Sequence, residues 1–485
     1  MESAKKFADR REKILYKFGS VQLGFEDFGQ AAGVRLSPEN RWVRKASLVP
    51  WEAIEGRYAA LFPSGEGNVA KPLRLALGAL LIQTEREISD EETAIQIMET
   101  PCLQWFCGRA QYEEKMPFDP SLMVYFRRRL TPEILGEINE MIIRASKKAN
   151  GGNKKGKRGR PRKGGKNDDD DNSGTLILDA TCAPCNIKYP QDTELLNDAR
   201  EKLEGLIDHL HDPSDGEKPR TYRRKARKAY LKTARKRKKT KSEIRKAIGA
   251  QLRYIKRDLG IIERYLADGK TLTKKQAALL ETLKKIYEQQ LFMHSTRTHS
   301  VPERIVSIHQ PHLRPIVRGK VRTPVEFGPK LDISVADGFV RVEKISFEAY
   351  NESENLQTAI ERYKKRTGRY PQRVLTDKIY RNRDNLAWCR ERGIRLSGPA
   401  LGRPKKDATR DKTLEYKDLC DRVEVERAFS LAKRKFGLGL LRTTRPETTL
   451  AAVAASILAL NLAKLFYPFL SVLKSTLFPP RFHYA

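Results

Sequence analysis

Acidic residues end two predicted strands and recur on a later helix. Asp179 ends the apolar run that starts at Thr175, Asp377 ends a second run from Arg373, and a helix predicted from about Asp421 carries further acids. Carboxylates gathered at strand ends supply the hard oxygen ligands that Mg²⁺ prefers. Three of them are enough to hold two ions roughly 3.5–4 Å apart, the arrangement that cleaves phosphodiesters. Taken singly, each aspartate is more typical of a turn or cap.

Two other local patterns have metal-ligand spacing. Cys182-Ala-Pro-Cys185 lacks a second cysteine pair, and His309-Gln-Pro-His312 lacks an obvious third ligand. Packing cysteines and a plain loop are therefore favoured over zinc sites.

The charge of the chain points to a polyanionic partner. Its 485 residues carry 95 Lys and Arg against 61 Asp and Glu, a net charge of +34. A field of that size favours nucleic acid binding. The 6 cysteines are too few and scattered for a disulfide framework, which indicates a reducing cytoplasm. The charged N-terminus lacks a signal-peptide core, and Asn461 and Lys464 follow the most apolar stretch, 450–460, so we expect no export and no membrane span.

Helix-start signals recur between residues 51 and 148. Ser89-Asp-Glu-Glu92 is a capping box, and Asp119-Pro120 and Thr131-Pro132 each place an N-cap before a proline. They predict an all-α N-terminal domain. The helix predicted from Pro120 ends in Arg127, Arg128 and Arg129, which is compatible either with a helix-turn-helix-like DNA reader or with an exposed basic helix end.

Residues 149–174 have almost no apolar side chains and predict a disordered linker. Arg158-Gly-Arg160-Pro resembles an AT-hook, which lays arginines into an A·T minor groove; a solvated tether is the alternative. The acidic run 168–171 is read as solubilising. Gly402-Arg-Pro-Lys-Lys is a second basic loop, which either contacts DNA or only connects two elements.

After the linker, the pattern predicts a mixed sheet interrupted by a helical insertion. The first strand, from Thr175, is followed by helical sequence from 193 to about 294, where residues 218–246 hold sixteen Lys or Arg against only Glu243. With so little acid to pair, phosphate contact is favoured over a solvated face. The pattern then predicts a strand from Val325, a hairpin turn at Asp337-Gly338 and a helix over 355–366. It ends with the strand that Asp377 closes and with helices from about Asp421 and Thr448.

These motifs resemble the DDE transposases of bacterial insertion sequences, whose catalytic domain is RNase H-like. The segments 72–80, 89–92 and 117–121 are similar to the InsH-type N-terminal domain, and Leu178-Asp-Ala-Thr-Cys-Ala-Pro and Thr376-Asp-Lys-Ile-Tyr to the strands of the first and second aspartate. Residues 421–433 match the family spacing of Arg422, Glu426 and Lys433. Leu419 and Ile379 stand where the family usually has Tyr and Gly.

The resemblance implies that Asp179, Asp377 and Glu426 hold two Mg²⁺ ions, for which Mn²⁺ can substitute, with Asp179 bridging. It also implies that Arg422 and Lys433 contact DNA phosphates. The reaction would be hydrolysis at the element ends followed by attack of the 3′-hydroxyl on target DNA. At about 100° per residue, Arg422, Glu426 and Lys433 share one helix face, and Glu424 lies some 160° from Glu426.

We therefore expect an α/β protein with a DNA-binding helical domain at 1–148, a linker at 149–174, an RNase H-like core at 175–192 and 319–485, and a basic insertion at 193–318. The expected function is DNA transposition, with Arg158, Arg160, Arg127 and Arg128 as further DNA contacts. Expected partners are terminal inverted repeats and target DNA, bound by a homodimer at the nucleoid in the cytoplasm. Two alternatives stay open: an inactive, transposase-derived DNA-binding protein, and a metal-dependent nuclease without strand transfer.

Overall fold

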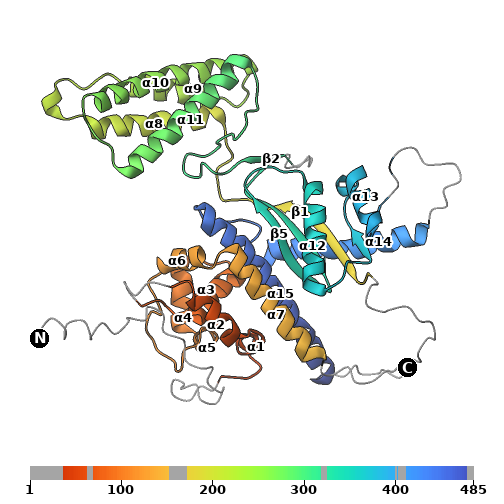
Figure 1. Ribbon diagram of the computed structural model, residues 1–485. Helices are drawn as coiled ribbons and strands as arrows, with labels where there is room; N and C mark the ends of the chain where they lie inside the picture. The colour runs from red at the N-terminus through yellow and green to blue at the C-terminus, as the bar shows by residue number, and fades with distance from the viewer. Residues whose placement is uncertain are drawn as a thin grey trace, which may run out of the picture. The chain divides into compact units, whose positions relative to one another are not determined.

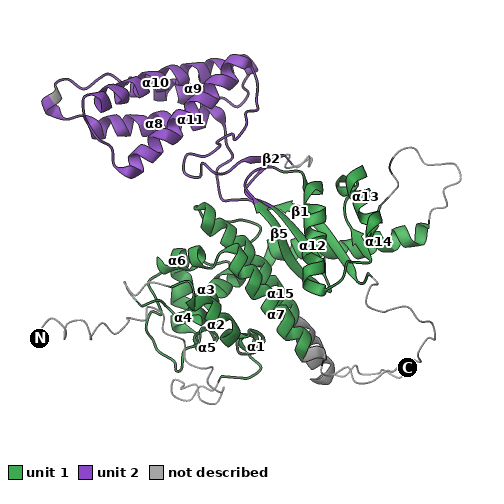
Figure 2. Ribbon diagram, viewed as in Figure 1, with its two compact units in different colours: residues 1–183, 331–345, 350–485 green, residues 184–330, 346–349 purple. Residues whose placement is uncertain are grey.

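The computed structural model describes residues 36–62, 69–151, 172–317, 325–398, 401 and 411–477. The chain divides into two compact units (Figure 2). Unit 1 comprises residues 1–183, 331–345 and 350–485, and unit 2 comprises residues 184–330 and 346–349. The predicted AT-hook, the acidic run 168–171 and the basic loop at 402–406 lie outside the described residues.

Unit 1 begins with a bundle of helices. They are α1 (Arg41–Leu48), α2 (Trp51–Ala59), α3 (Leu73–Arg86), α4 (Asp90–Glu99), α5 (Pro101–Phe106), α6 (Leu122–Arg129) and α7 (Pro132–Gly151). N-cap bonds are present at Ser89, which accepts from Glu92 N, and at Thr131, which accepts from Ile134 N. The capping box predicted at Ser89 is only half formed, because the Glu92 carboxylate accepts from Gln96 Nε2. Helix α6 begins two residues later than predicted, because Asp119 accepts from Ser121 within the preceding turn.

The second part of unit 1 is a 5-stranded sheet in the order β5-β4-β1-β6-β7 (Figure 1). Its strands are β1 (Thr175–Cys182), β4 (Lys330–Ala336), β5 (Phe339–Ser346), β6 (Arg373–Leu375) and β7 (Arg395–Leu396). The predicted hairpin turn joins β4 to β5, and both of its residues have positive φ, 53° at Asp337 and 78° at Gly338. The fold is thus mixed α/β, as expected.

Helices cover both faces of this sheet. They are α12 (Leu356–Thr367), α13 (Arg383–Glu391) and α14 (Lys412–Lys435), with short 3₁₀ turns η3 (Glu352–Asn355) and η4 (Lys378–Tyr380). Leu176 and Leu178 of β1 share a core with α12 and α13. Because side chains alternate along a strand, Ile177 and Asp179 face the other side, and β1 also contacts α14.

Helix α15 (Pro446–Leu477) ties the sheet to the helical bundle. It packs on α3, α6 and α7. The buried Asn461 accepts from Val340 N at 2.9 Å and donates to Val340 O at 2.7 Å and to Asn139 Oδ1 at 2.8 Å. Its amide therefore satisfies the edge strand β5 as a neighbouring strand would. Among the described helices, α15 alone is long and apolar enough to cross a membrane, but 78% of that window is buried, as in a core helix.

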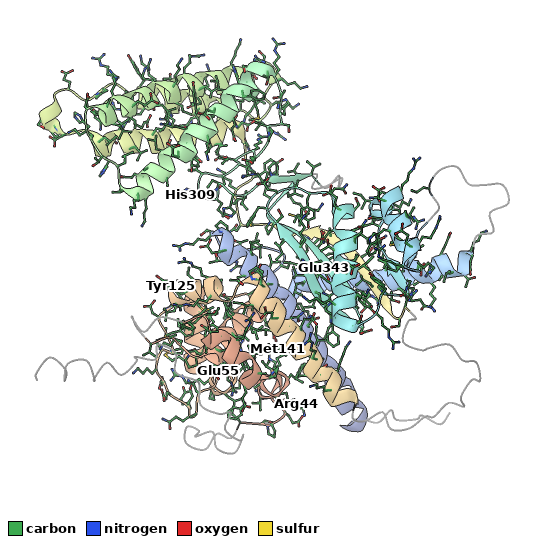
Figure 3. All side chains as sticks on the ribbon, in the orientation of Figure 1. Arg44, Glu55, Tyr125, Met141, His309 and Glu343 are labelled. Atoms are coloured by element: carbon green, nitrogen blue, oxygen red, sulfur yellow. The ribbon has the colours of Figure 1, made fainter. Side chains whose placement is uncertain are left out.

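A buried carboxylate of the same sheet pairs with cations of α12. Glu343 of β5, labelled in Figure 3, accepts from Ser334 Oγ at 2.6 Å and pairs with Arg366 at 3.0 Å. Such a buried charge is tolerated because its partners satisfy it.

Unit 2 contains the helical insertion α8 (Asp192–Leu210), α9 (Arg223–Ala234), α10 (Lys241–Ala267) and α11 (Lys274–Thr296), with the short turn η2 (Pro213–Asp215). It also contains a small antiparallel sheet of β2 (Pro315–Val317) and β3 (Val325–Phe327). The prediction of one continuous strand from Val325 is wrong. Strand β3 pairs with β2 in the small sheet, and a separate strand, β4, starts at Lys330. The break between β3 and β4 contains Gly328.

Candidate functional site

The register between β1 and β6 brings the two predicted aspartates together. The strands are parallel, with Thr175 opposite Arg373 and Ile177 opposite Leu375. Asp179 and Asp377 each lie two residues beyond the last of these pairs, and they are close enough for the charge of Asp377 to act on Asp179. Neighbouring strands lie about 4.8 Å apart. Asp179 does not end its strand as predicted, because β1 continues to Cys182; Asp377 lies just past β6 and accepts from Lys378 N at 2.7 Å.

Helix α14 supplies the third acid, and ion pairs anchor it to the sheet. Asp418, itself buried, pairs with Arg395 of β7 at 2.6 Å and with Arg373 of β6 at 3.0 Å. Arg373 also donates to Asp421 at 2.6 Å and to Thr175 at 2.7 Å. These bonds hold α14 across β1, β6 and β7. The helix starts at Lys412, earlier than predicted, so it carries the anchor as well as the motif.

Arg422 connects the two acids from different elements. Its guanidinium lies 3.5 Å from Asp377 Oδ1 and 3.6 Å from Glu426 Oε1. Glu424 points elsewhere: its Oε1 lies 4.0 Å from Lys464 Nζ and 3.7 Å from the position that a Cβ on Gly338 would take. The helix-face assignment made from the sequence is therefore confirmed for Arg422, Glu426 and Glu424.

The electrostatics of the site are those of a carboxylate cluster. Burial raises the pKa of Asp179, and the negative charges of Glu352 and Asp377 add to this effect, whereas Arg422 opposes it. Burial also raises the pKa of Tyr380, on which Asp332, Glu352, Asp179 and Asp377 all act in the same direction. The site holds more negative charge than Arg422 alone offsets, which is the situation a bound divalent cation relieves.

Two acids of this cluster were not anticipated from the sequence. Glu352 lies in η3, and the buried Asp332 on β4 accepts from Tyr350 Oη at 2.7 Å and Asn355 Nδ2 at 3.0 Å. Neither belongs to a recognisable motif. The one sequence feature that could have indicated this cluster is Asp332, an acid within the mostly apolar strand β4.

The donor set fits Mg²⁺ by chemistry, because it offers only carboxylate oxygens from three elements. In the part of the chain that the structure describes, however, no three His, Cys, Asp or Glu side chains are close enough to hold one ion. Arg422 lies against two of the acids instead. Beside them is a pocket of about 360 Å³ lined by Thr376, Asp377, Lys378, Arg381, Leu419 and Arg422, among others.

The remaining predicted site residues lie apart. Lys433, two turns beyond Glu426, lines a different pocket of about 700 Å³ together with Arg127, Arg442 and Arg445. Arg127 is buried in the bundle, where it pairs with Asp90 and donates to Gln83 at 2.9 Å. Its guanidinium is thus already engaged within the bundle, and its role as a DNA contact stays a prediction. Arg128 is half exposed and lies 3.6 Å from Glu447. Arg158 and Arg160 fall outside the described residues.

The other metal-like patterns are packing features. Cys182 and Cys185 are both buried, as expected of packing cysteines. The ring of His312 packs edge-on against Phe347, with centroids 4.6 Å apart.

Two family models match segments of unit 1. The family model "Transposase DDE domain" matches residues 374–463, which include Asp377, Glu426 and Lys433 but not Asp179. The family model "Transposase domain (DUF772)" matches residues 31–129. An uncharacterized protein, ORF8 in the nfe locus of Rhizobium meliloti, is 28% identical over 111 residues, which are 23% of this chain and 53% of that protein. The match thus spans about half the length of the relative. No solved structure matches the chain.

Proposed function

Because its matched segments are those of transposases, this chain is a relative of the insertion-sequence DDE transposases, and we propose that it cleaves DNA at the ends of an insertion sequence and joins the freed 3′-hydroxyls to target DNA. One observation carries the proposal. Arg422 of α14 lies 3.5 Å from Asp377 and 3.6 Å from Glu426, and Asp179 and Asp377 belong to segments that follow the parallel pairing of β1 with β6, which supports a shared role for the three acids.

The strand order supports an RNase H-like core. Strand β1 lies in the middle of the sheet, between the hairpin strand β4 and the parallel strand β6, and the third acid comes from a helix packed on the same face. Asp377 follows the carboxyl end of β6, the side of an α/β sheet where ligands commonly bind.

Each residue has a distinct task in the proposed reaction. Asp179, Asp377 and Glu426 would hold two Mg²⁺ ions, which when bound activate the attacking oxygen and stabilise the leaving one. Arg422 would turn from Asp377 and Glu426 to the phosphate whose charge rises during transfer. Lys433 would contact a phosphate farther along the strand, because it lies about 10 Å along α14 from Glu426. Cleavage and joining are both in-line phosphoryl transfers, so one site serves both.

The test is a cleavage and joining assay with the full chain. The substrate is DNA that carries both sequences flanking the coding gene, incubated with Mg²⁺, with Mn²⁺, or with EDTA. Asp179→Asn, Asp377→Asn and Glu426→Gln should each lower cleavage by more than about 100-fold, the upper range for losing only an outer-shell partner of a metal. Glu424→Gln is the matched control and should remain active.

Two outcomes would overturn the proposal. Cleavage without joined products would identify a nuclease. Binding without cleavage in either metal would identify an inactive DNA-binding relative. Equal loss from Glu424→Gln, with a normal circular dichroism spectrum, would show that the third ligand is misassigned.

A further inference from the structure

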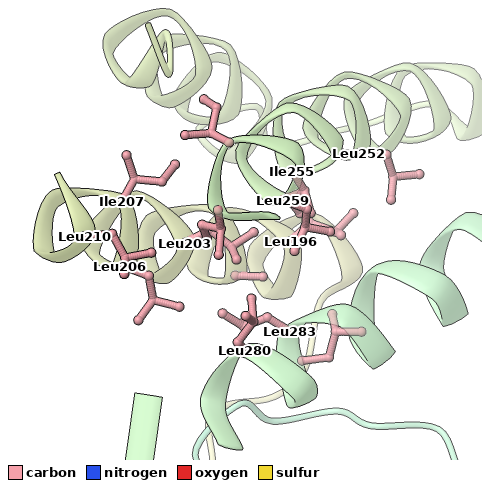
Figure 4. Packing of buried hydrophobic residues seen from close by; sticks show 14 of the residues in the cluster. Leu196, Leu203, Leu206, Ile207, Leu210, Leu252, Ile255, Leu259, Leu280 and Leu283 are labelled. Atoms are coloured by element: carbon pink, nitrogen blue, oxygen red, sulfur yellow. The ribbon is translucent and has the colours of Figure 1, made fainter. Parts of the chain in front are cut away.

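Unit 2 is a folded module with a hydrophobic core of its own. Leu196, Leu203 and Ile207 of α8 pack with Ile255 of α10 and Leu283 of α11 (Figure 4). Helix α9 packs on α8 and α10 but buries only Ala226. Most of α9 is therefore available for something other than packing.

The exposed side of α9 is a continuous cationic stripe. It consists of Arg224, Lys228, Lys232 and Arg235, all exposed, and Arg235 caps the helix. At about 100° per residue these positions fall within roughly 80° of one another, and their mean direction lies about 165° from Ala226. The stripe thus points directly away from the core of unit 2, and it rises roughly 16 Å along the helix.

Two acids of unit 2 that lie near α9 in the sequence pair with other cations. Asp208 pairs with Lys218 and, at 2.7 Å, with Arg223, and Glu243 pairs with Lys236. Among the described residues, no carboxylate lies within ion-pair distance of the four stripe cations. Four adjacent charges of one sign repel one another, which disfavours the bare helix unless a polyanion is bound.

We propose that this stripe binds the sugar-phosphate backbone of duplex DNA. The choice of duplex DNA rests on the proposed function. The composition of the stripe favours phosphate groups as its ligand, because Arg and Lys are the side chains that most often contact phosphates. A membrane surface would need an apolar face beside the charges. Single strands would need aromatic rings for stacking along the binding surface, whereas the four residues of the stripe are all Arg or Lys, and the neighbouring Tyr222 ring already has Arg257 at 4.5 Å and Lys225 at 5.6 Å.

The length of the stripe matches a DNA strand. Roughly 16 Å corresponds to about five base-pair steps of 3.4 Å. Up to four phosphates can therefore be neutralised, and the contacts carry no base information. The stripe holds DNA without selecting its sequence, so selection of the element ends belongs to other parts of the chain.

The test is the salt dependence of duplex binding by the full chain in EDTA, where no cleavage occurs. The variant R224Q/R227Q/K228Q/K232Q/R235Q removes the stripe and the neighbouring Arg227. We expect the log K against log salt slope to become shallower by about 3 to 4, at about 0.9 per lost contact. The control K246Q/R264Q/K274Q/K275Q/K285Q removes the same charge from α10 and α11 and should change the slope by less than about 1.

Three results would overturn the proposal: an unchanged slope in the stripe variant, an equal loss in the control, or tighter binding of single-stranded RNA than of duplex DNA. Arg224→Lys/Arg235→Lys, which keeps both charges, should retain the wild-type slope and separates lost contacts from misfolding. Binding is measured without cleavage and is repeated in Glu426→Gln. The result therefore tests the stripe separately from the proposed transposase activity.

Discussion

Arg422 Nη1 lies 3.5 Å from Asp377 Oδ1, so a cation of α14 meets the acid that follows β6. The same guanidinium reaches Glu426 one turn along the helix. Two of the three proposed metal ligands are thus joined through an arginine rather than to each other. The electrostatic balance of the site therefore depends on this one side chain.

Removing Arg422 should raise the pKa of Asp179 further, because its positive charge favours the carboxylate. We expect Arg422→Ala to move the acidic limb of the cleavage rate against pH toward higher pH, and Arg422→Lys to move it less. The measurement is the rate between pH 5 and 9. Arg434→Ala, on the exposed end of the same helix, is the control. An unmoved limb in Arg422→Ala would show that the two groups are not coupled.

Neighbouring arginines of α6 should behave oppositely in stability assays. Arg127 is buried against Gln83 and the partly exposed Asp90, so Arg127→Ala removes charged hydrogen bonds from a largely desolvated pair and should cost about 2 kcal/mol or more. Arg128 forms an exposed pair, and Arg128→Ala should cost less than about 1 kcal/mol. Urea unfolding followed by tryptophan fluorescence measures both. Equal costs would contradict the buried pairing.

Asp258 should make unit 2 less stable as pH rises. Its side chain is fully buried on α10, neither carboxylate oxygen has a hydrogen-bond partner among the described residues, and burial raises its pKa to about 7. Glu204 adds to this shift. A raised carboxyl pKa means that the folded state holds a proton that the unfolded state has released. Stability therefore falls from about pH 4 to about pH 7 and is level above it.

Asp258→Asn and Asp258→Leu should remove this pH dependence. Each pKa unit corresponds to about 1.4 kcal/mol, so at pH 8 we expect a gain of a few kcal/mol. Hydrogen exchange of the α10 amides at pH 5 and 8, corrected for intrinsic rates, reports the local opening free energy. Asp212→Asn, an exposed acid of the same unit, serves as the control. A wild-type opening free energy that is equal at both pH values would disprove the assignment.

The linker arginines should add A·T preference without affecting chemistry. Arg158→Ala/Arg160→Ala is expected to weaken binding to A·T-rich duplex more than to G·C-rich duplex, because the minor groove mainly distinguishes these two classes. Cleavage rates at saturating protein should not change. Equal weakening on both duplexes would reduce the motif to a basic tether.

Features set by local chemistry were predictable from sequence. Asp337-Gly338 is a turn because both residues must adopt positive φ, which a strand or helix does not allow and this residue pair tolerates. Glu426 shares a face with Arg422, and Glu424 does not, because a helix repeats every 3.6 residues. The caps at Ser89 and Thr131 follow the same logic, since each needs only the next three residues.

Tertiary structure alone decided which distant groups meet and which charges are buried. Asp179 and Asp377 are close to each other only because β1 pairs with β6, a strand separated from it in the sequence by the whole of unit 2. The pairing of Arg127 with Asp90 and Gln83 could not be predicted, because these partners lie 37 and 44 residues away in the sequence. Glu352 and Asp258 carried no motif at all. Burial and pairing depend on contacts between residues far apart in sequence, and helical or strand periodicity carries no information about those contacts.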